Sequence, residues 1–163
     1  MKPLADNSGK TSTTDTTGTT STYRATGSDE AGQSVRLSVT TEDDLLTVRH
    51  TVRSAAVQTG FGIVDQTRVV TAASELARNA YIHGGGGNLL IEHTHAPGRS
   101  GLRLTIRDNG PGIPDLEAAL MDGYSTGAGL GHGLGGACRL MDEFHVHSLS
   151  GQGTTVITTR WTH

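Results

Sequence analysis

The stretch Leu102–Pro114, LRLTIRDNGPGIP, contains the end of a strand and the turn that follows it. Apolar residues at 102, 104 and 106 alternate with polar ones, which is the period of a strand with one buried face. Two glycines and two prolines follow Asp108 and end the regular structure. The pattern predicts a carboxylate at the end of a core strand, beside a turn with little side-chain bulk.

Asp108, with Gly110 and Gly112 after it, is suited to binding a flat polar ligand. The carboxylate can accept a hydrogen bond from an exocyclic amine, and the glycines let a ligand approach the backbone closely. Adenine carries such an amine, whereas guanine presents a carbonyl at the same position. An ordinary turn is the alternative interpretation, because Asn-Gly and Pro-Gly are common turn dipeptides.

The composition is typical of one domain without an internal disulfide. The chain has 163 residues, 34% of them apolar, and Cys138 is its only cysteine, which we expect to be a small core residue. A net charge of −3 offers no basic surface for nucleic acid or for an anionic membrane. No segment has the apolar length of a signal peptide or a transmembrane helix. We therefore expect a cytoplasmic protein with neither nucleic acid nor membrane as a partner.

The distribution of charged and apolar residues separates a tail from a folded domain. Residues 1–33 are rich in Thr, Ser, Gly and Asp and have few large apolar side chains, which predicts a disordered tail before a domain at 34–163. Lys2 and Lys10 are the only lysines, and both lie in that tail. P-loop NTPases and ordinary protein kinases need a phosphate-facing lysine, so both classes are excluded. Phosphate charge would have to be met by a metal ion, backbone N–H groups, helix N-termini or arginine.

Hydrophobic periodicity predicts helices on one face of a mixed, mainly antiparallel sheet, an α+β two-layer sandwich. One strand is expected at a sheet edge and two others to form a hairpin through a loop at 97–101. In chain order the expected elements are an edge strand at 35–39, helices at 41–59 and 65–83, strands at 89–93 and 102–107, helices at 115–121 and 133–143, and strands at 144–149 and 154–161.

The second expected helix carries Glu75 and Asn79, which lie on one face because they are four residues apart. Asn79 can supply a neutral oxygen to Mg²⁺, while Glu75 can accept a proton from a nucleophile near a γ-phosphate. His83 lies one turn further along the helix. A solvated helix face is the alternative interpretation of the same residues.

A glycine-rich stretch, Ser125–Gly136 (STGAGLGHGLGG), leads directly into another expected helix. Successive glycines let backbone N–H groups point at phosphate oxygens, and the helix N-terminus adds a favourable dipole. A flexible linker is the alternative. The candidate nucleotide contacts here are Ser125, Thr126, Gly127, Gly129, Leu130, Gly131, Gly133 and Leu134.

Taken in order, these segments resemble the Bergerat-fold ATP-binding superfamily, which includes gyrase B, Hsp90, histidine kinases and MutL. The resemblance covers residues 35–161, and within the superfamily SELARN at 74–79, DGYSTGAGLG at 122–131 and RLMDEF at 139–144 look most like RsbT-type anti-sigma regulatory kinases. The matching motifs are Glu75 to Asn79 for the N box, Asp108-x-Gly110-x-Gly112 for the first glycine box, Gly129–Gly135 for the ATP lid, and Gly151-x-Gly153-Thr154 for the last glycine box.

The resemblance implies an ATP- and Mg²⁺-dependent serine/threonine kinase that phosphorylates STAS-domain anti-anti-sigma proteins in a bacterial partner-switching pathway. It implies Glu75 as general base, Asn79 as Mg²⁺ ligand, Asp108 as adenine acceptor, and Thr154 as a support for Asp108 through its hydroxyl. The alternative is a non-catalytic, nucleotide-dependent binding module, an anti-sigma factor or phosphatase coactivator, whose partner is a sigma factor or a PP2C-type phosphatase. The presence of Glu75 favours the kinase.

Two histidine pairs, His93-x-His95 and His145-x-His147, have a spacing that places both rings on one face of a strand. The sequence fixes no third ligand near either pair, and no cysteine accompanies them. From the sequence alone, surface histidines are therefore favoured over a dedicated transition-metal site.

Overall fold

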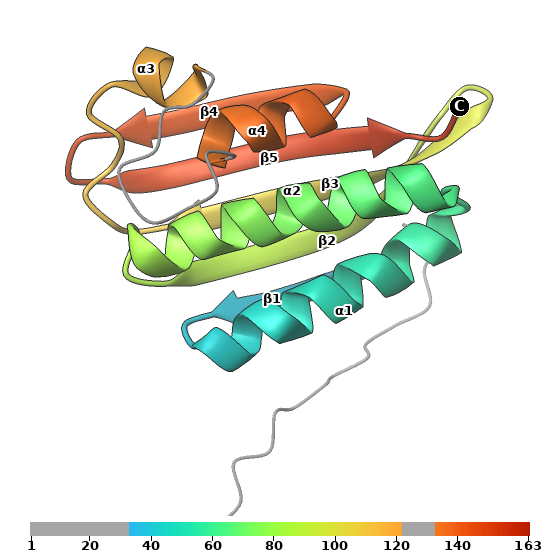
Figure 1. Ribbon diagram of the computed structural model, residues 1–163, viewed down its shortest axis with the longest axis horizontal. Helices are drawn as coiled ribbons and strands as arrows, with labels where there is room; N and C mark the ends of the chain where they lie inside the picture. The colour runs from blue at the N-terminus through green and yellow to red at the C-terminus, as the bar shows by residue number, and fades with distance from the viewer. Residues whose placement is uncertain (1–32, 122–132) are drawn as a thin grey trace, which may run out of the picture.

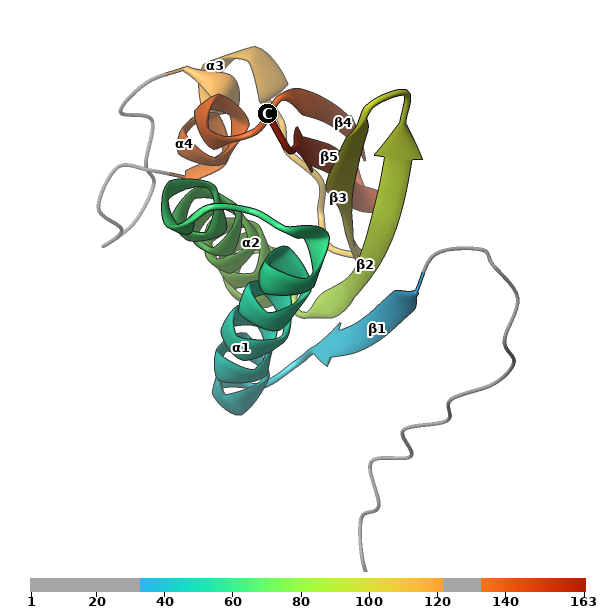
Figure 2. The same ribbon diagram turned by 90° about the vertical axis from the view of Figure 1, so that its right-hand side faces the viewer.

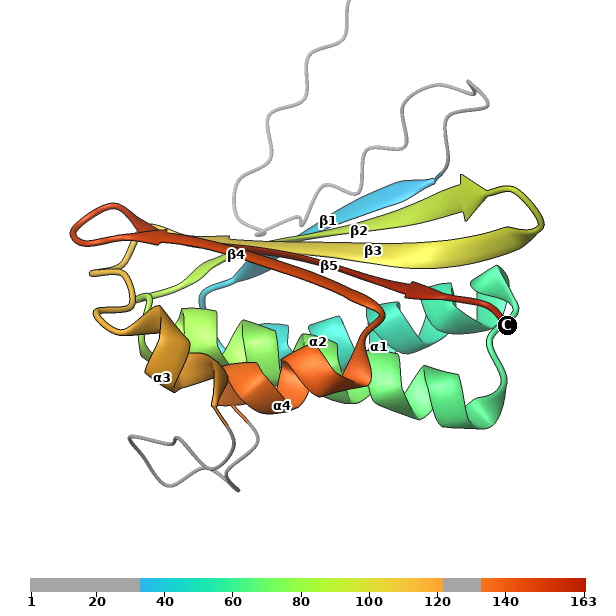
Figure 3. The ribbon, with the colours of Figure 1, turned by 90° about the horizontal axis from the view of Figure 1, so that it is seen from above.

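The computed structural model describes residues 33–121 and 133–163, so the predicted tail, except Gln33, and most of the glycine-rich stretch lie outside the described residues. One five-stranded sheet has the strand order β1-β2-β3-β5-β4. All four described helices lie on the same face of this sheet (Figure 1, Figure 3). This is the expected α+β sandwich. Within the described ranges, no helix combines the length and apolar character needed to cross a membrane.

The sheet is antiparallel throughout its described strands, without the parallel pair that the expected mixed sheet would contain. β1 lies at one edge, as expected for residues 35–39. Only Pro97 and Gly98 join β2 to β3, because Arg99–Gly101, expected in a loop, pair with 94–96 across the hairpin. The strands are β1 (Ser34–Val39), β2 (Gly87–Ala96), β3 (Arg99–Asp108), β4 (Glu143–Leu149) and β5 (Gly153–Trp161).

Helix α1 (Glu42–Thr59) begins and ends at the predicted residues. Thr41 is its N-cap: the Thr41 hydroxyl accepts from the backbone N–H of Asp44 at 3.1 Å, and the Asp44 carboxylate accepts from the N–H of Thr41 at 3.0 Å. A further hydrogen bond from the N–H of Thr40 lowers the pKa of Asp44. At the other end Gly60 has a φ of +91°, the left-handed conformation that terminates many helices.

Helix α2 (Ile63–Ile82) crosses the middle of the helical layer, between α1 and α4 (Figure 2). It begins two residues before the expected start at Asp65. The predicted apolar stripe, Val69, Ala73, Leu76, Ala77 and Ala80, is buried in full. Because most of these side chains are small, α2 can lie close to the sheet, whose buried side chains include Leu89, Ile91, Leu102, Leu104 and Ile106.

Two short helices complete the layer. Helix α3 (Leu116–Leu120) is followed, after the undescribed stretch, by α4 (Gly133–Leu140), which packs against both α2 and α3. A methyl group added to Gly135 would lie 2.6 Å from the carbonyl oxygen of Leu120, so the two short helices are in close contact. Helix α4 ends at Leu140 rather than at residue 143, because the chain enters β4 at Glu143. Cys138 is only partly buried, so its prediction as a core residue holds in part.

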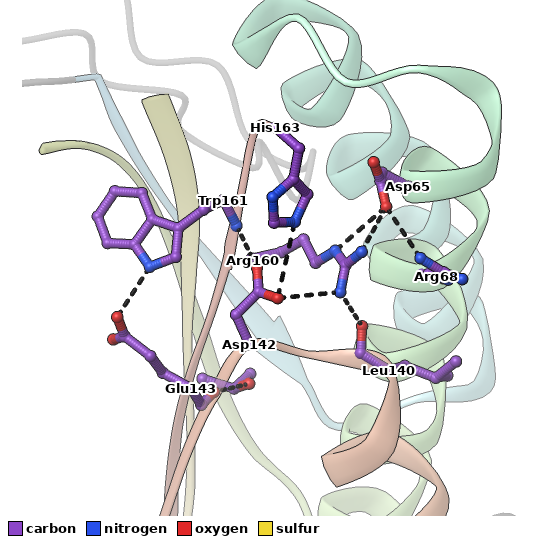
Figure 4. Close-up of polar contacts among 9 residues, drawn as sticks. Asp65, Arg68, Leu140, Asp142, Glu143, Arg160, Trp161 and His163 are labelled. Atoms are coloured by element: carbon purple, nitrogen blue, oxygen red, sulfur yellow. Dashed lines mark hydrogen bonds and ion pairs between the residues drawn. The ribbon is translucent and has the colours of Figure 1, made fainter. Parts of the chain in front are cut away.

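A buried arginine joins helix α2 to strand β5. Arg160 on β5 is 8% exposed, and its Nη2 lies 2.6 Å from Oδ1 of Asp65 in the first turn of α2. Its Nη1 lies 3.2 Å from Oδ1 of Asp142 and donates to the carbonyl oxygen of Leu140 (Figure 4). The other oxygen of Asp142 accepts from the N–H of Trp161 at 2.7 Å. The charge of this arginine is thus neutralised by two carboxylates, as a buried charge requires.

The Asp65–Arg160 pair gives a testable dependence of stability on pH. The hydrogen bond from Arg160 lowers the pKa of Asp65 in the folded protein. The contribution of Asp65 is therefore fully present above its unfolded pKa of about 3.9 and is lost as the pH falls through the lower folded value. Asp65→Asn should lower the free energy of unfolding at pH 7 by about 1.5–3 kcal/mol, the range for hydrogen bonds to charged groups. Denaturant unfolding from pH 7 to pH 2 measures it.

In that experiment the difference between wild type and variant should shrink as the pH falls below about 4. Glu117→Gln is the matched control, because it removes an exposed carboxylate that makes no ion pair within the described ranges. We expect it to change stability by less than about 0.5 kcal/mol. If the difference in free energy of unfolding between wild type and Asp65→Asn stays constant down to pH 2, the charge of Asp65 is not the cause of that difference.

Candidate nucleotide site

The end of β3 is in close contact with the residue that follows the C-cap of α2, and glycines at positions 84 and 110 make this contact possible. A methyl group added to Gly84 would overlap the Cγ and Cβ atoms of Asp108, and one added to Gly110 would lie 2.6 Å from Cα of Gly84. The backbone after α2 therefore lies directly against the Asp108 side chain. Sequence reasoning did not identify Gly84 as part of the site, because its role depends on a contact between residues distant in the chain.

The carboxylate of Asp108 is oriented by its own turn. Oδ1 accepts a hydrogen bond from the N–H of Gly110 at 2.9 Å, the local side-chain to backbone bond that Asp commonly makes at turns. Among the described residues, Oδ2 has no hydrogen-bond partner, and the residue is half-buried. One oxygen thus fixes the orientation of the carboxylate, and the other is available to a ligand.

The turn after Asp108 is held against the β4–β5 hairpin. Gly112 has a φ of +81°, and a methyl group there would lie 2.5 Å from the carbonyl oxygen of Leu149, so a side chain is excluded by both conformation and space. The carbonyl oxygen of Pro111 accepts from the N–H of Gly151 at 2.9 Å. The N–H of Ile113 donates to Oγ of Ser148 at 2.8 Å. The predicted glycine turn is therefore anchored to a neighbouring hairpin.

Ser148 connects this turn to Thr154. Its Oγ lies 2.9 Å from Oγ1 of Thr154 and 3.3 Å from the carbonyl oxygen of Gly153, to which it donates. Thr154 is the cross-strand partner of Asp108, and its described side-chain hydrogen bond is with Ser148, so the expected support of Asp108 by its hydroxyl stays a prediction. Sequence reasoning missed Ser148, because a serine within a strand gives no local signal of such contacts.

Glu75 and Asn79 lie on α2, at the flank of its buried apolar stripe. Both side chains are partly exposed, and neither makes a hydrogen bond or ion pair within the described ranges. His83 is the exposed C-cap of the same helix, and Gly84 follows it against Asp108. Among the described residues, a carboxylate and a carboxamide without hydrogen-bond partners thus lie on the helix whose end contacts Asp108.

The predicted phosphate-binding residues fall into two groups. Ser125, Thr126, Gly127, Gly129, Leu130 and Gly131 lie outside the described residues. Gly133 and Leu134 form the first turn of α4, where Leu134 is 7% exposed and packs in the core. The side chain of Leu134 therefore packs in the core, and any contact with a nucleotide would come from its backbone. As expected, a helix N-terminus follows the glycine-rich stretch.

The donor set at Asn79 fits a Mg²⁺ ion that arrives with phosphate. In residues 33–121 and 133–163, no three His, Cys, Asp or Glu side chains form a cluster that could hold a metal. Mg²⁺ is commonly bound through one or two protein oxygens, with water and substrate phosphates completing its octahedron. The free carboxamide of Asn79 suits that mode, whereas a permanent metal centre would need more ligands.

Comparison with known proteins agrees with this geometry. The family described as "Histidine kinase-like ATPase domain" matches residues 29–160. A serine/threonine-protein kinase RsbT from Bacillus subtilis (strain 168) is 46% identical over 123 residues, which cover 76% of this chain and 92% of the relative. An anti-sigma F factor from Bacillus licheniformis is 35% identical over 122 residues, covering 69% of this chain and 80% of the relative.

A solved structure has the same fold at lower identity. The RsbU and RsbW domains of a Mycobacterium tuberculosis protein match with a TM-score of 0.54 and 23% identity, covering 78% of this chain and 32% of that one. This chain thus spans about a third of that structure. Together with the extent of the family match, these similarities show that the chain belongs to the histidine kinase-like ATPase domain family, and that among its relatives it is similar to RsbT.

Proposed function

We propose that this protein is a cytoplasmic, ATP- and Mg²⁺-dependent serine/threonine protein kinase whose substrates are STAS-domain anti-anti-sigma proteins. The observation that carries the proposal is the unpaired Glu75, on the same helix face as the unpaired Asn79. The 46% identical relative bears the name of a serine/threonine-protein kinase, which supports the reaction class. The STAS substrate rests on the resemblance to RsbT-type kinases.

Asp108 would recognise the adenine ring. Its Oδ2 can accept a hydrogen bond from the exocyclic amine while Oδ1 remains bound to the N–H of Gly110. Gly84, Gly110 and Gly112 keep side chains away from this carboxylate, because each is packed against backbone or against Asp108 itself. The position therefore favours a flat ring that carries an amine over one that presents a carbonyl.

Asn79 would hold Mg²⁺, which supplies charge neutralisation at the phosphates when it is bound. Glu75 lies one helical turn earlier, on the same face. The carboxylate of Glu75 would accept the proton of a seryl or threonyl hydroxyl as the hydroxyl oxygen bonds to the γ-phosphorus of ATP, while the bond from that phosphorus to the β–γ bridging oxygen breaks and ADP leaves. The N-terminus of α4 and the glycine-rich stretch before it would contact the phosphates, with His83 at the margin of the site.

A second candidate function is a non-catalytic binding module that uses nucleotide to set its conformation. The relatives named anti-sigma F factor favour it, since their names denote binding of a regulatory target. Its partner would be a sigma factor or a PP2C-type phosphatase. Wild-type protein that binds a STAS partner tightly but transfers no phosphate would favour this function over the kinase.

Glu75→Ala tests the kinase most directly. General-base catalysis contributes about 10²–10⁴-fold, so phosphotransfer from labelled ATP to a STAS protein of the same genome should fall by that factor. Affinities for ATP and for the partner should change little, because Glu75 contacts neither nucleotide base nor metal in the proposed arrangement. Glu92→Ala on β2, next to the core residue Ile91, is the control and should keep wild-type rates. A Glu75→Ala variant as fast as wild type would remove Glu75 as the base.

Asp108→Asn tests recognition of the base. Replacing one carboxylate oxygen by an NH₂ group mispairs it with the adenine amine, which should weaken ATP binding by about 1–3 kcal/mol. Calorimetric titration of wild type and variant with ATP and GTP measures this, with GTP binding weakly to wild type. The free energy of unfolding of the variant should fall by no more than the hydrogen bond to the N–H of Gly110 contributes. Equal ATP affinities would contradict the assignment of Asp108.

Ser148→Ala tests whether the β4–β5 hairpin positions the turn that follows Asp108. The variant leaves the N–H of Ile113 and the hydroxyl of Thr154 without their partner, at about 0.5–1.5 kcal/mol for each hydrogen bond. We expect KM for ATP to rise severalfold while kcat stays constant, because the hydrogen bonds of Ser148 are with Ile113, Gly153 and Thr154 and not with Glu75. Ser148→Thr keeps the hydroxyl and should restore KM. A fall in kcat at unchanged KM would contradict a positioning role.

A further inference from the structure

A hollow lies at the end of the molecule opposite to the candidate nucleotide site. It holds about 240 Å³ of space, and the residues that line it include Gln58 and Thr59 at the end of α1, His93 and His95 on β2, and Ser100 on β3. The end of α1 and the β2–β3 hairpin lie at one end of the helical layer, whereas α2 ends at the other (Figure 1, Figure 3). None of the residues that line this hollow is a proposed nucleotide contact.

Two imidazole rings line this hollow from one strand. His93 and His95 alternate along β2, so their side chains leave the same face of the sheet about 6.7 Å apart at the backbone. Nδ1 of His93 lies 3.0 Å from Oγ1 of Thr59, and Nδ1 of His95 lies 3.3 Å from Oγ of Ser100. In each ring one nitrogen is thus bound to a hydroxyl, and Nε2 is the nitrogen that remains.

The hydrogen bonds of Thr59 determine the tautomer of His93. The Thr59 hydroxyl donates its only proton to the carbonyl oxygen of Ala55 at 2.8 Å, so it must accept from His93. The proton of the neutral ring is therefore on Nδ1, and Nε2 carries the lone pair. Metal-binding histidines typically show this arrangement, in which the ring nitrogen that does not bind the metal donates to a fixed oxygen.

We propose that His93 and His95 bind a divalent transition-metal ion of the Zn²⁺ class through their Nε2 atoms. Imidazole nitrogen suits Zn²⁺, Ni²⁺ and Cu²⁺, whereas Mg²⁺ prefers oxygen, so this ion is distinct from the one at Asn79. Water and the carboxamide of Gln58 complete the coordination. Because no third His, Cys, Asp or Glu joins the pair within the described ranges, the ion exchanges readily. It fastens the end of α1 to the β2–β3 hairpin, and the proposal is independent of the kinase.

The test is calorimetric titration of ZnCl₂ into the untagged full chain without nucleotide, with one ion expected per chain. His95→Gln should weaken binding at least about tenfold, and because His95 is exposed the variant keeps the core intact. The matched control is the double variant His145→Gln and His147→Gln on β4, which removes exposed rings of the same spacing that make no hydrogen bond within the described ranges. The control should keep wild-type affinity at the site.

Thr59→Val tests the role of the hydroxyl. It is nearly isosteric but cannot accept from Nδ1 of His93, and loss of such a supporting group typically costs about 10–100-fold in metal affinity. Imidazole ¹⁵N spectra should show Zn²⁺ shifting the Nε2 signals of both His93 and His95. Absence of Zn²⁺ binding to wild type, or equal affinity in His95→Gln, would overturn the proposal. Loss of the bound ion in the β4 double variant would assign it to the other pair.

Discussion

The site depends on one constraint, the direct approach of backbone to the carboxylate at the end of β3. A methyl group at Gly84 would overlap Asp108 itself, and one at Gly153 would overlap the carbonyl oxygen of Asp108. The end of α2, the central strand and the last strand can therefore meet only where side chains are missing. Because close-packed interiors transmit small changes in volume, a single added methyl group here would separate the end of α2 from the Asp108 carboxylate.

Helix α2 is held at both ends, and this fixes the face that carries Glu75 and Asn79. At its first turn, Asp65 is bound to the buried Arg160 of β5, and at its end Gly84 lies against Asp108. Between these points small side chains such as Ala73 and Ala77 pack on the sheet. A catalytic carboxylate contributes only when it is held in the productive geometry, so the stabilising contacts of α2 are also what positions the proposed base.

The parts of the site that the sequence predicted are those with a local signal. Asp108 followed a period-2 strand, and Glu75 and Asn79 shared the helical spacing of one face, so both could be placed without tertiary information. Ser148 and Gly84 could not, since each acts on residues distant in the chain. The short β2–β3 turn was missed for a related reason: ladder pairing extends through Ser100 and Gly101 despite their turn-like composition. Residues 122–132 lie outside the described chain, so their predicted contacts remain predictions.

The absence of lysine from residues 34–163 gives the proposed metal a larger role than it has in kinases with a phosphate-binding lysine. Triphosphate charge in this chain would be met by Mg²⁺ at Asn79, by backbone N–H groups, by the N-terminus of α4 or by arginine. Because Mg²⁺ prefers phosphate oxygens and Asn79 offers it one neutral oxygen, ion and nucleotide would each increase the affinity for the other, since linkage between two bound ligands is reciprocal. Occupancy of the base-binding position and of the metal position would therefore be coupled through the phosphates rather than through movement of the sheet.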